Sequence, residues 1–324
     1  MNIDIAGGGS LGLLLAGKLA HVPGVRARLI ARTREQAELV AREGIAVLER
    51  DGVERRARIA CESFDDAVGS AIAADWLWIA TKQTHWNDAL LSYAARSARA
   101  GARLLLFQNG VGHVERLAAA GVPADRLFVA VTTEGAKKTA ADAVAHTGSG
   151  YTAIGGAAAV APSSAFPARD VLRAAGFAAD AVQDIESYIR RKLLTNSVIN
   201  PLTAILRVTN GELSASPHYR EAMRALFDEA FAALAPGAPG AEPEGREAEW
   251  SRVLDVCAAT AANFSSMLQD VLAGRETEID AITGAVLRAA KAKGVGAPTH
   301  AAVYAMVRGL TAGRVDADSY SRDS

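Results

Sequence analysis

Short apolar runs alternate with amphipathic segments through the first half of the chain, which predicts alternating strands and helices. Four strands are predicted, at residues 2–6, 26–31, 75–80 and 103–107, and the last two have the composition of buried parallel strands. Helical patterns lie between them, up to residue 19 and over 33–43 and 86–98. Further strands are predicted at 127–132, 151–154 and 177–182, and a hairpin over 45–59 that turns at Asp51-Gly52. This alternation predicts a doubly wound α/β sheet.

From residue 184 onward the pattern is helical, with the clearest segments at 187–206, 219–234, 247–272 and 279–293. We therefore predict a Rossmann-type α/β domain over 1–183 and an all-helical domain over 184–324, with a hinge at Gln183–Glu186. The segment 235–245 is rich in proline and glycine and predicts an exposed interhelical loop, either a lid or a passive connection. The end of the chain, 316–324, is polar and is expected to fray.

Composition narrows the class of protein. Half of the 324 residues are hydrophobic, and the formal net charge of -1 gives no global attraction to nucleic acid or to an anionic membrane. The clustered Arg55-Arg56 fits a solvated strand edge. No stretch approaches the roughly 20 apolar residues needed to span a bilayer. Cys61 and Cys257 lie far apart, so neither a disulfide framework nor a metal site is indicated. We expect a soluble cytoplasmic protein that acts on a small molecule; a homodimer is one oligomeric state that the sequence leaves open.

A glycine-rich motif directly follows the first strand and opens the first helix. In G-x-G-x-x-G, the first glycine allows a tight turn, the second lets the backbone approach a pyrophosphate, and the third packs helix on strand. The motif alone is weak, but this position favours dinucleotide binding over a turn that binds nothing. The predicted cofactor-binding residues are Gly7, Gly8, Gly9, Ser10, Leu11 and Gly12.

The end of the second strand bears on which dinucleotide is bound. Dinucleotide folds that bind NAD usually place a carboxylate there for the ribose 2′-hydroxyl, but this chain reads Ala31-Arg32-Thr33-Arg34. An arginine can instead neutralise a 2′-phosphate through paired hydrogen bonds. We therefore predict NADP rather than NAD, with Arg32 as the contact. The alternative is that Arg32 and Arg34 merely begin a solvated helix.

Lys82 and Asn109 each lie just past a predicted parallel strand, where carboxyl ends line the ligand crevice. Either residue could equally serve a turn, since Asn-Gly favours tight turns. Their occurrence at one end of the sheet favours a role in ligand binding.

Three polar residues, Lys192, Asn196 and Asn200, recur every fourth position through an apolar helical stretch. This spacing places them on one helix face. A cation and two amides turned toward a buried surface need partners, either from a neighbouring helix or from a bound polar ligand. Pro201 disfavours regular helix at Asn200, so a kink is expected there that turns Asn200 toward the cleft.

Two further motifs lie in the predicted helical domain. The segment from Ser265 to Asp270 is predicted to lie on a helix. Thr277 is predicted to cap the next helix, with Asp280 three residues on and Glu278 in the first turn, where the helix dipole favours its ionised form.

Together these segments resemble the ketopantoate reductase family, in family order and over nearly the whole chain. The matching motifs are Gly7-x-Gly9-x-x-Gly12, Thr81-Lys82, Gln108-Asn109-Gly110-Val111-Gly112, Arg191-Lys192-Leu193 with Asn196 to Ala204, Asn210-Gly211-Glu212-Leu213, Ser265 to Asp270, and Thr277-Glu278-Ile279-Asp280. The carboxy-terminal motifs are far more specific than the glycine loop. The segment 236–245 is longer and richer in proline than the family leads us to expect.

The resemblance implies NADPH-dependent reduction of 2-dehydropantoate to (R)-pantoate in pantothenate and coenzyme A synthesis. It implies that Lys192 is the catalytic lysine and Glu278 its companion carboxylate. It also implies that Asn196, Asn200 and Ser266 bind substrate, and that Lys82 and Asn109 lie at the cofactor and the interdomain cleft, with Asn109 touching both ligands.

Two other functions remain open. A paralogous NADP-dependent reductase would act on another 2-oxo acid and differ around Asn200 and Ser266, which here keep the family residues. A non-catalytic NADP-binding sensor would give no reason to group a lysine, two amides and a carboxylate.

Overall fold

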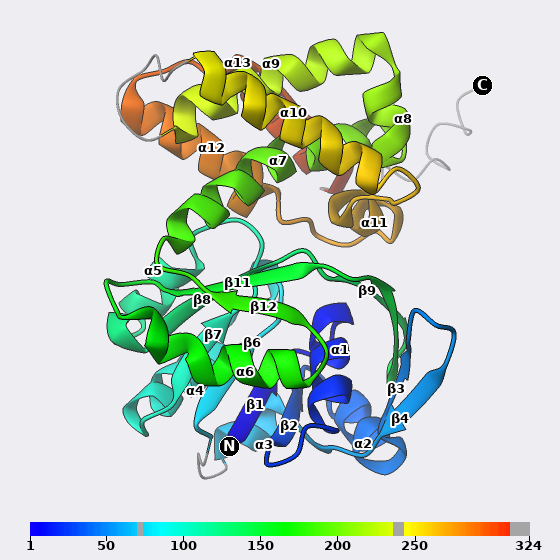
Figure 1. The fold of residues 1–324 in the computed structure, drawn as a ribbon, viewed down its shortest axis with the longest axis vertical. Helices are drawn as coiled ribbons and strands as arrows, with labels where there is room; N and C mark the ends of the chain where they lie inside the picture. Colours follow the sequence, from blue (N-terminus) through cyan, green and yellow to red (C-terminus); the bar gives the residue numbers. More distant parts are fainter. Residues whose placement is uncertain (70–73, 236–242, 312–324) are drawn as a thin grey trace, which may run out of the picture. The chain divides into compact units, whose positions relative to one another are not determined.

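A computed structural model describes residues 1–69, 74–235 and 243–311 (Figure 1). Contacts divide the chain into two compact units. The first comprises Met1–Gln108 and Gly112–Tyr188, and the second comprises Asn109–Val111 and the chain from Ile189 onward. The boundary after Tyr188 falls within a long helix, α7 (Ile185–Leu206). The short segment Asn109–Val111 thus joins the second unit although both its neighbours in sequence belong to the first.

The first unit is built on an eight-stranded sheet with the order β12-β11-β8-β7-β6-β1-β2-β5. Its strands are β1 (Asn2–Ala6), β2 (Arg26–Ala31), β5 (Ala60–Ser63), β6 (Trp76–Ile79), β7 (Arg103–Leu106), β8 (Leu127–Thr132), β11 (Tyr151–Gly156) and β12 (Ala178–Ala181). All neighbours run parallel except β8 and β11. Because the chain goes from β1 to β2 on one side and later returns to β6 on the other, the strand order reverses beside β1, which is where doubly wound sheets bind ligands.

Helices cover both faces of this sheet. They are α1 (Ser10–Leu19), α2 (Arg34–Glu43), α3 (Phe64–Gly69), α4 (Asp88–Arg99), α5 (His113–Ala119) and α6 (Phe166–Ala174), with short 3-10 turns η1 (Gln83–His85), η2 (Ala124–Arg126) and η3 (Pro162–Ala165). Successive side chains of a strand point to opposite faces, so Ile3 and Ile5 enter one core while Ala6 enters the other. The predicted doubly wound α/β fold is confirmed.

A second, four-stranded sheet was only half predicted. Its order is β4-β3-β10-β9, formed by β3 (Ile45–Leu48), β4 (Glu54–Ala57), β9 (Gly135–Ala140) and β10 (Ala143–Gly148). The hairpin of β3 and β4 is confirmed, with Gly52 at φ +82° in its turn, and Arg55-Arg56 lies on the edge strand β4. Nothing in the sequence indicated that β10 pairs with β3.

Helix α1 packs against this second sheet as well as the first (Figure 1). A Cβ at Gly17 would lie 2.5 Å from Val47, so the glycine lets β3 approach closely. The helix buries Leu13, Leu14 and Leu15, and such an apolar surface all round is expected of a helix covered on opposite sides.

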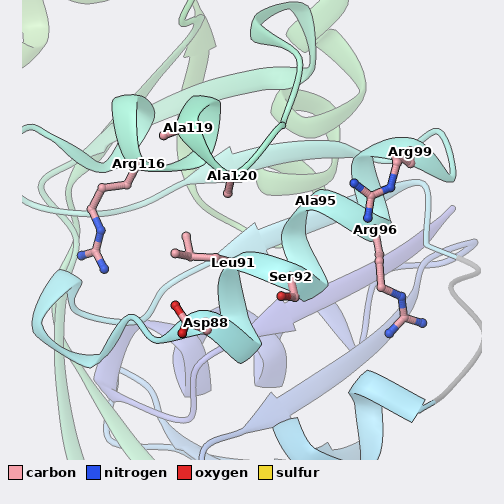
Figure 2. Close-up of a pocket in the computed structure, with 9 residues that line it drawn as sticks. All are labelled: Asp88, Leu91, Ser92, Ala95, Arg96, Arg99, Arg116, Ala119 and Ala120. Carbon is pink, nitrogen blue, oxygen red and sulfur yellow. The ribbon is translucent and has the colours of Figure 1, made fainter.

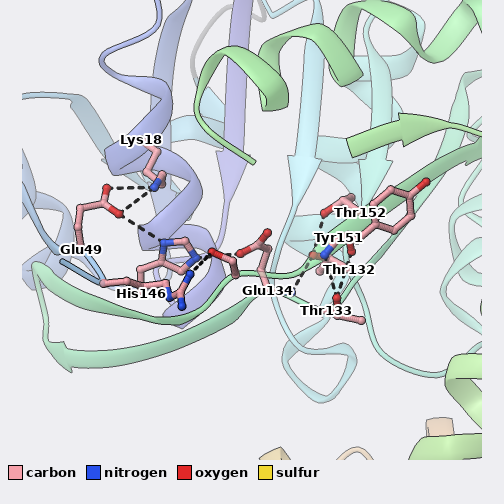
Figure 3. A network of polar contacts seen from close by, with 10 residues as sticks. Lys18, Glu49, Thr132, Thr133, Glu134, His146, Tyr151 and Thr152 are labelled. Atoms are coloured by element: carbon pink, nitrogen blue, oxygen red, sulfur yellow. Dashed lines mark hydrogen bonds and ion pairs between the residues drawn. The ribbon is translucent and has the colours of Figure 1, made fainter. Parts of the chain in front are cut away.

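A polar network also ties α1 to the second sheet (Figure 3). Lys18 Nζ donates to Glu49 at 2.9 Å, and the buried His146 lies between two carboxylates, 2.8 Å from Glu134 and 3.4 Å from Glu49. Burial opposes ionisation of Glu49, but Lys18 and His146 prevail and lower its pKa. These contacts hold the second sheet against helix α1.

The second unit is helical, as predicted. Beyond Tyr188 it contains the rest of α7, followed by α8 (Asn210–Ala215), α9 (Pro217–Leu234), α10 (Pro243–Ala259), α11 (Ser266–Leu272), α12 (Ile279–Lys293) and α13 (Pro298–Thr311). Its core includes Val198, Phe227 and Val286. The short α8 and the final α13 were not predicted.

The prediction of one helix over 247–272 is wrong. The chain leaves helical geometry after Ala259, where backbone N–H groups of Asn210 and Gly211 donate to the carbonyls of Asn263 and Ala261. Helix α11 then begins afresh behind Ser265, whose hydroxyl accepts from Leu268 N.

None of the helices in the described ranges combines the length and apolar character needed to cross a membrane. Most of the predicted loop at 235–245 and the whole of the predicted tail at 316–324 lie outside the described residues.

Candidate active site

The glycine loop leaves β1 and turns at once into α1. Gly7 has φ +122°, a conformation that a side chain would strain. A Cβ at Gly12 would lie 1.8 Å from Gly7 O, so only glycine lets the helix begin against the turn. At Gly9, the N-cap, a Cβ would meet nothing within 4 Å. The side of the loop at Gly9 is therefore open for close approach.

The amino terminus of α1 is suited to an anion. No side chain caps this helix, and its first turn carries no acidic residue. Backbone N–H groups at a helix start together with the positive end of the helix dipole attract phosphate. The loop and the start of α1 therefore have the open backbone and the positive end that a pyrophosphate site requires.

The two arginines after β2 have different surroundings. Thr33 caps α2 by accepting from Gln36 N, and Arg34 pairs with Asp66 at 2.7 Å on the surface. Arg32 precedes the cap, and no ion pair holds it within the described chain. Of the two, Arg32 is the one whose guanidinium is available to a ligand.

Lys82 and Asn109 follow neighbouring strands, as the sequence predicted. Gln108 Nε2 donates to the carbonyls of Ile79, at 2.8 Å, and Thr81, at 2.9 Å, and so ties the carboxyl ends of β7 and β6 together. Lys82 occupies the N-cap position of η1, next to this junction. The junction borders the reversal point of the sheet on the β6 side, and the glycine loop follows β1.

Asn109 contacts Glu278, which the sequence had named independently. Its Nδ2 donates to Glu278 Oε2 at 3.2 Å, across 169 positions of sequence. Gly110 has φ +72°, and a Cβ there would lie 2.2 Å from Ala281 O, while Val111 N donates to that same carbonyl at 3.1 Å. The glycine is therefore required for the segment to dock on the start of α12.

The prediction that Thr277 caps α12 is wrong. Glu278 itself is the N-cap residue and no side chain caps the helix; Thr277 Oγ1 is buried without a hydrogen-bond partner in the described structure. Glu278 is only 6% exposed, and its carboxylate lies at the positive end of the helix. Because the carboxylate does not cap its own helix, its oxygens can accept from Asn109 and attract a nearby cation.

Lys192 is that cation. Burial lowers the pKa of Lys192 to about 8, although attraction to Glu278 opposes the change. A lysine with a pKa near 8 can exchange a proton close to neutral pH. The structure therefore brings together Lys192, Glu278 and Asn109, all named from the sequence.

Asn196 and Asn200 lie one and two turns further along α7. Asn200 is buried and Asn196 partly so. Helix α7 continues through Pro201 to Leu206, so Asn200 stays helical, and the kink expected there stays a prediction. Helix packing therefore overrides the local preference of the residue before proline.

Ser266 is the first residue of α11 and is exposed. The preceding Ser265 is buried, and its hydroxyl lies 2.7 Å from that of Thr203 on α7. Thr203 also contacts the carbonyl of Asn200, at 3.0 Å. This chain of contacts fixes the start of α11, and with it Ser266, against the part of α7 that carries Asn200.

Other features of the described chain do not join this site. A groove of about 770 Å³ between α4 and α5, lined by Arg96, Arg99 and Arg116 among others, contains none of the predicted site residues (Figure 2). Within the described ranges, no group of three His, Cys, Asp or Glu side chains is arranged to hold a metal ion.

Comparison with known families gives these residues a context. A family model described as "Ketopantoate reductase PanE/ApbA" matches residues 3–159, and one described as "Ketopantoate reductase PanE/ApbA C terminal" matches residues 184–311. The chain belongs to the ketopantoate reductase family. The resemblance drawn from the sequence motifs is thereby confirmed.

Two relatives of this ketopantoate reductase family member illustrate matches along almost its whole length. A 2-dehydropantoate 2-reductase of Bacillus subtilis is 34% identical over 315 residues, covering 96% of this chain and 97% of that protein. One from Archaeoglobus fulgidus is 32% identical over 311 residues, covering 96% and 98%.

Solved structures of similar fold also match along almost the whole chain. A probable 2-dehydropantoate 2-reductase from Bacillus subtilis superposes with a TM-score of 0.77 at 32% identity, covering 96% of this chain and all of that one. A D-mandelate dehydrogenase in complex with NADH and anilino(oxo)acetate has a TM-score of 0.84 at 24% identity, covering 96% and 99%, a likeness of fold alone.

One residue close to the glycine loop was not predicted from the sequence. Lys138, on β9, donates from Nζ to Gly8 O at 2.9 Å. The surrounding sequence has no strand-like alternation and no motif, so no sequence signal pointed to it.

Proposed function

We propose that this protein reduces 2-dehydropantoate to (R)-pantoate with NADPH, in the synthesis of pantothenate and coenzyme A. The observation that carries the proposal is the grouping of Lys192 with the buried Glu278, which Asn109 also contacts. The names and full-length similarity of the relatives support the choice of substrate.

NADPH fits the residues of the first unit. The open side at Gly9 and the uncapped start of α1 suit its pyrophosphate, and Arg32 suits its 2′-phosphate. Lys82, beside the reversal point of the sheet, is placed to contact it further. Bound NADPH supplies the hydride that adds to the ketone carbon.

The residues of the second unit handle the proton and the substrate. Negative charge develops on the ketone oxygen as the carbon is reduced, and the Lys192 ammonium stabilises that charge and donates the proton that completes the alcohol. Glu278 keeps the ammonium in place and favours its charged form. Asn196, Asn200 and Ser266 orient the carboxylate and hydroxyl of the substrate without titrating. Solvent then returns a proton to Lys192.

The pH dependence of the reaction should reveal this lysine. We expect kcat/KM to fall as pH rises through about 8, because the donor is the protonated form. Glu278 raises the pKa of Lys192, so Glu278→Gln should move this falling limb to lower pH. A limb that stays in place in Glu278→Gln would separate it from Lys192.

Arg32→Asp should reverse the cofactor preference, since it replaces a cation for the 2′-phosphate by a carboxylate that favours a ribose hydroxyl. The dissociation constant of NADPH should rise by at least about tenfold, as expected for a lost charged hydrogen bond, while that of NADH changes little. Arg26→Asp at the exposed start of β2 is the matched control and should leave both unchanged. Equal weakening of both cofactors by Arg32→Asp would contradict the assignment.

Genetic complementation tests the function in a cell. Expression of this chain in a bacterium that lacks 2-dehydropantoate reduction should restore growth without pantothenate, and the Lys192→Ala variant should not. Failure of the unmodified chain to restore growth, with the folded protein present, would favour a different 2-oxo acid as substrate.

We also place the reaction in the cytoplasm. Cys61 and Cys257 are both free, and burial raises the pKa of each thiol to about 11, so both are stable as thiols in a reducing compartment. A homodimer is our working expectation for the assembly, which analytical ultracentrifugation would test.

A further inference from the structure

Strand β9 belongs to the second sheet, yet it is fastened to the glycine loop. The backbone N–H of Lys138 donates to Ser10 Oγ at 3.0 Å, and the Lys138 ammonium donates to Gly8 O at 2.9 Å. Gln36 Nε2 bridges the same carbonyl of Gly8, at 2.9 Å, and Ala141 O, at 2.7 Å. These bonds place the strand along the loop, with Lys138 as the strand residue that contacts Gly8.

Lys138 is also close enough to Arg32 for their charges to interact. Partial burial and the Arg32 guanidinium both lower the pKa of Lys138. Both side chains remain accessible to solvent, and within the described chain no carboxylate forms an ion pair with either. Two cations held together without an anion form a site in which a bound anion would relieve the repulsion.

The position of this pair in the dinucleotide fold indicates which anion. The adenine ribose lies at the end of β2, where Arg32 follows the strand, and Gly8 lies between the first two glycines of the loop. An ammonium has three donors, so Lys138 can keep its bond to Gly8 O and still donate to phosphate oxygens. The pyrophosphate, in contrast, would be bound by the backbone N–H groups at the start of α1.

We propose that Lys138 binds the 2′-phosphate of NADPH together with Arg32, as a residue that determines cofactor selectivity and that the second sheet supplies. This inference rests on the proposed function, because it assumes that NADPH is the cofactor. It also gives the second sheet a role in binding: β9 brings to the loop a cation that the eight-stranded sheet does not contain.

Equilibrium binding tests the inference without catalysis. The variant is Lys138→Gln, which keeps a donor for Gly8 O but removes the charge; the matched control is Lys137→Gln, because adjacent strand residues point to opposite sides. Fluorescence titration of Lys138→Gln should show NADPH binding weakened by about tenfold or more, with NADH binding changed less than about twofold. Lys137→Gln should bind both as the unmodified protein does.

A smaller probe isolates the phosphate. Adenosine 2′-monophosphate should compete with NADPH for the unmodified protein and compete more weakly for Lys138→Gln, while adenosine 5′-monophosphate should compete equally for both. Unchanged NADPH affinity in Lys138→Gln would overturn the inference. Equal weakening of NADPH and NADH would overturn it too, since Lys138 would then merely shape the loop or contact the pyrophosphate.

The inference and the proposed function can fail separately. If the unmodified protein binds neither cofactor, the proposed function fails and the inference with it. If the unmodified protein binds NADPH and reduces 2-dehydropantoate, while Lys138→Gln keeps the same ratio of NADPH to NADH affinity, only the inference fails.

Discussion

Replacing Lys192 by alanine should lower kcat for 2-dehydropantoate by roughly 10³-fold or more, the range expected when a positioned proton donor and charge are removed together. The dissociation constant of NADPH should stay nearly unchanged, because the residues assigned to the dinucleotide, apart from Asn109, lie in the other unit. Stopped-flow or steady-state rates, with a parallel NADPH titration, measure both quantities on one preparation.

Folding should survive this substitution. Burial lowers the pKa of Lys192, which means that the charged ammonium destabilises the folded state relative to a solvated lysine. Removing this charge should therefore not lower the melting temperature. Lys291→Ala, an exposed lysine of α12 in the same unit, is the matched control and should keep full activity. Near-normal turnover by Lys192→Ala would remove Lys192 from the chemistry.

The second large effect is expected at the glycine loop. Gly12→Ala places a Cβ 1.8 Å from Gly7 O, and because this oxygen is a backbone atom that cannot rotate away, α1 must move away from the turn. We expect NADPH binding to become undetectable by fluorescence titration, and the melting temperature to fall as the packing of α1 is disturbed.

Gly9→Ala separates ligand approach from folding. The added Cβ would meet no atom of the protein within 4 Å, so stability should be unchanged, but it would occupy the side that the pyrophosphate must approach. NADPH should therefore bind Gly9→Ala more weakly at an unaltered melting temperature. If Gly12→Ala bound NADPH like the unmodified protein, the loop would not be the cofactor site.

Local patterns predicted those parts of the fold in which one segment carries its own signal. Strand β2 over Arg26–Ala31, strand β8 over Leu127–Thr132 and helix α12 over Ile279–Lys293 have the predicted bounds. Each of these segments carries its own pattern of apolar residues, most of which are buried in the structure, and a glycine stands near at least one of its ends. Gly294, for example, ends α12 in the left-handed conformation that favours glycine.

Elements that depend on distant partners were not predictable in this way. Strand β9 reads Gly-Ala-Lys-Lys-Thr-Ala, with an exposed surface and no alternation, and it exists because it pairs with β10. The break between α10 and α11 likewise depends on bonds from Asn210 and Gly211, far back in the chain. Pairing and docking of this kind leave little local trace.

The same distinction holds for the site. Four-residue spacing placed Lys192, Asn196 and Asn200 on one face of α7, because helix geometry follows from sequence alone. The contact of Asn109 with Glu278 spans 169 positions, and only the family resemblance connected the two. Lys138 lies in neither a motif nor a periodic pattern, so only the structure connects it with the glycine loop.

The initial rate of NADPH oxidation with 2-dehydropantoate tests the central claim most directly, measured beside NADH and a small panel of other 2-oxo acids. We predict efficient turnover that is selective for NADPH and for 2-dehydropantoate, with (R)-pantoate as the product. Binding of NADPH without turnover of 2-dehydropantoate would contradict the proposed function, and turnover of another acid in the panel would identify the substrate that replaces it.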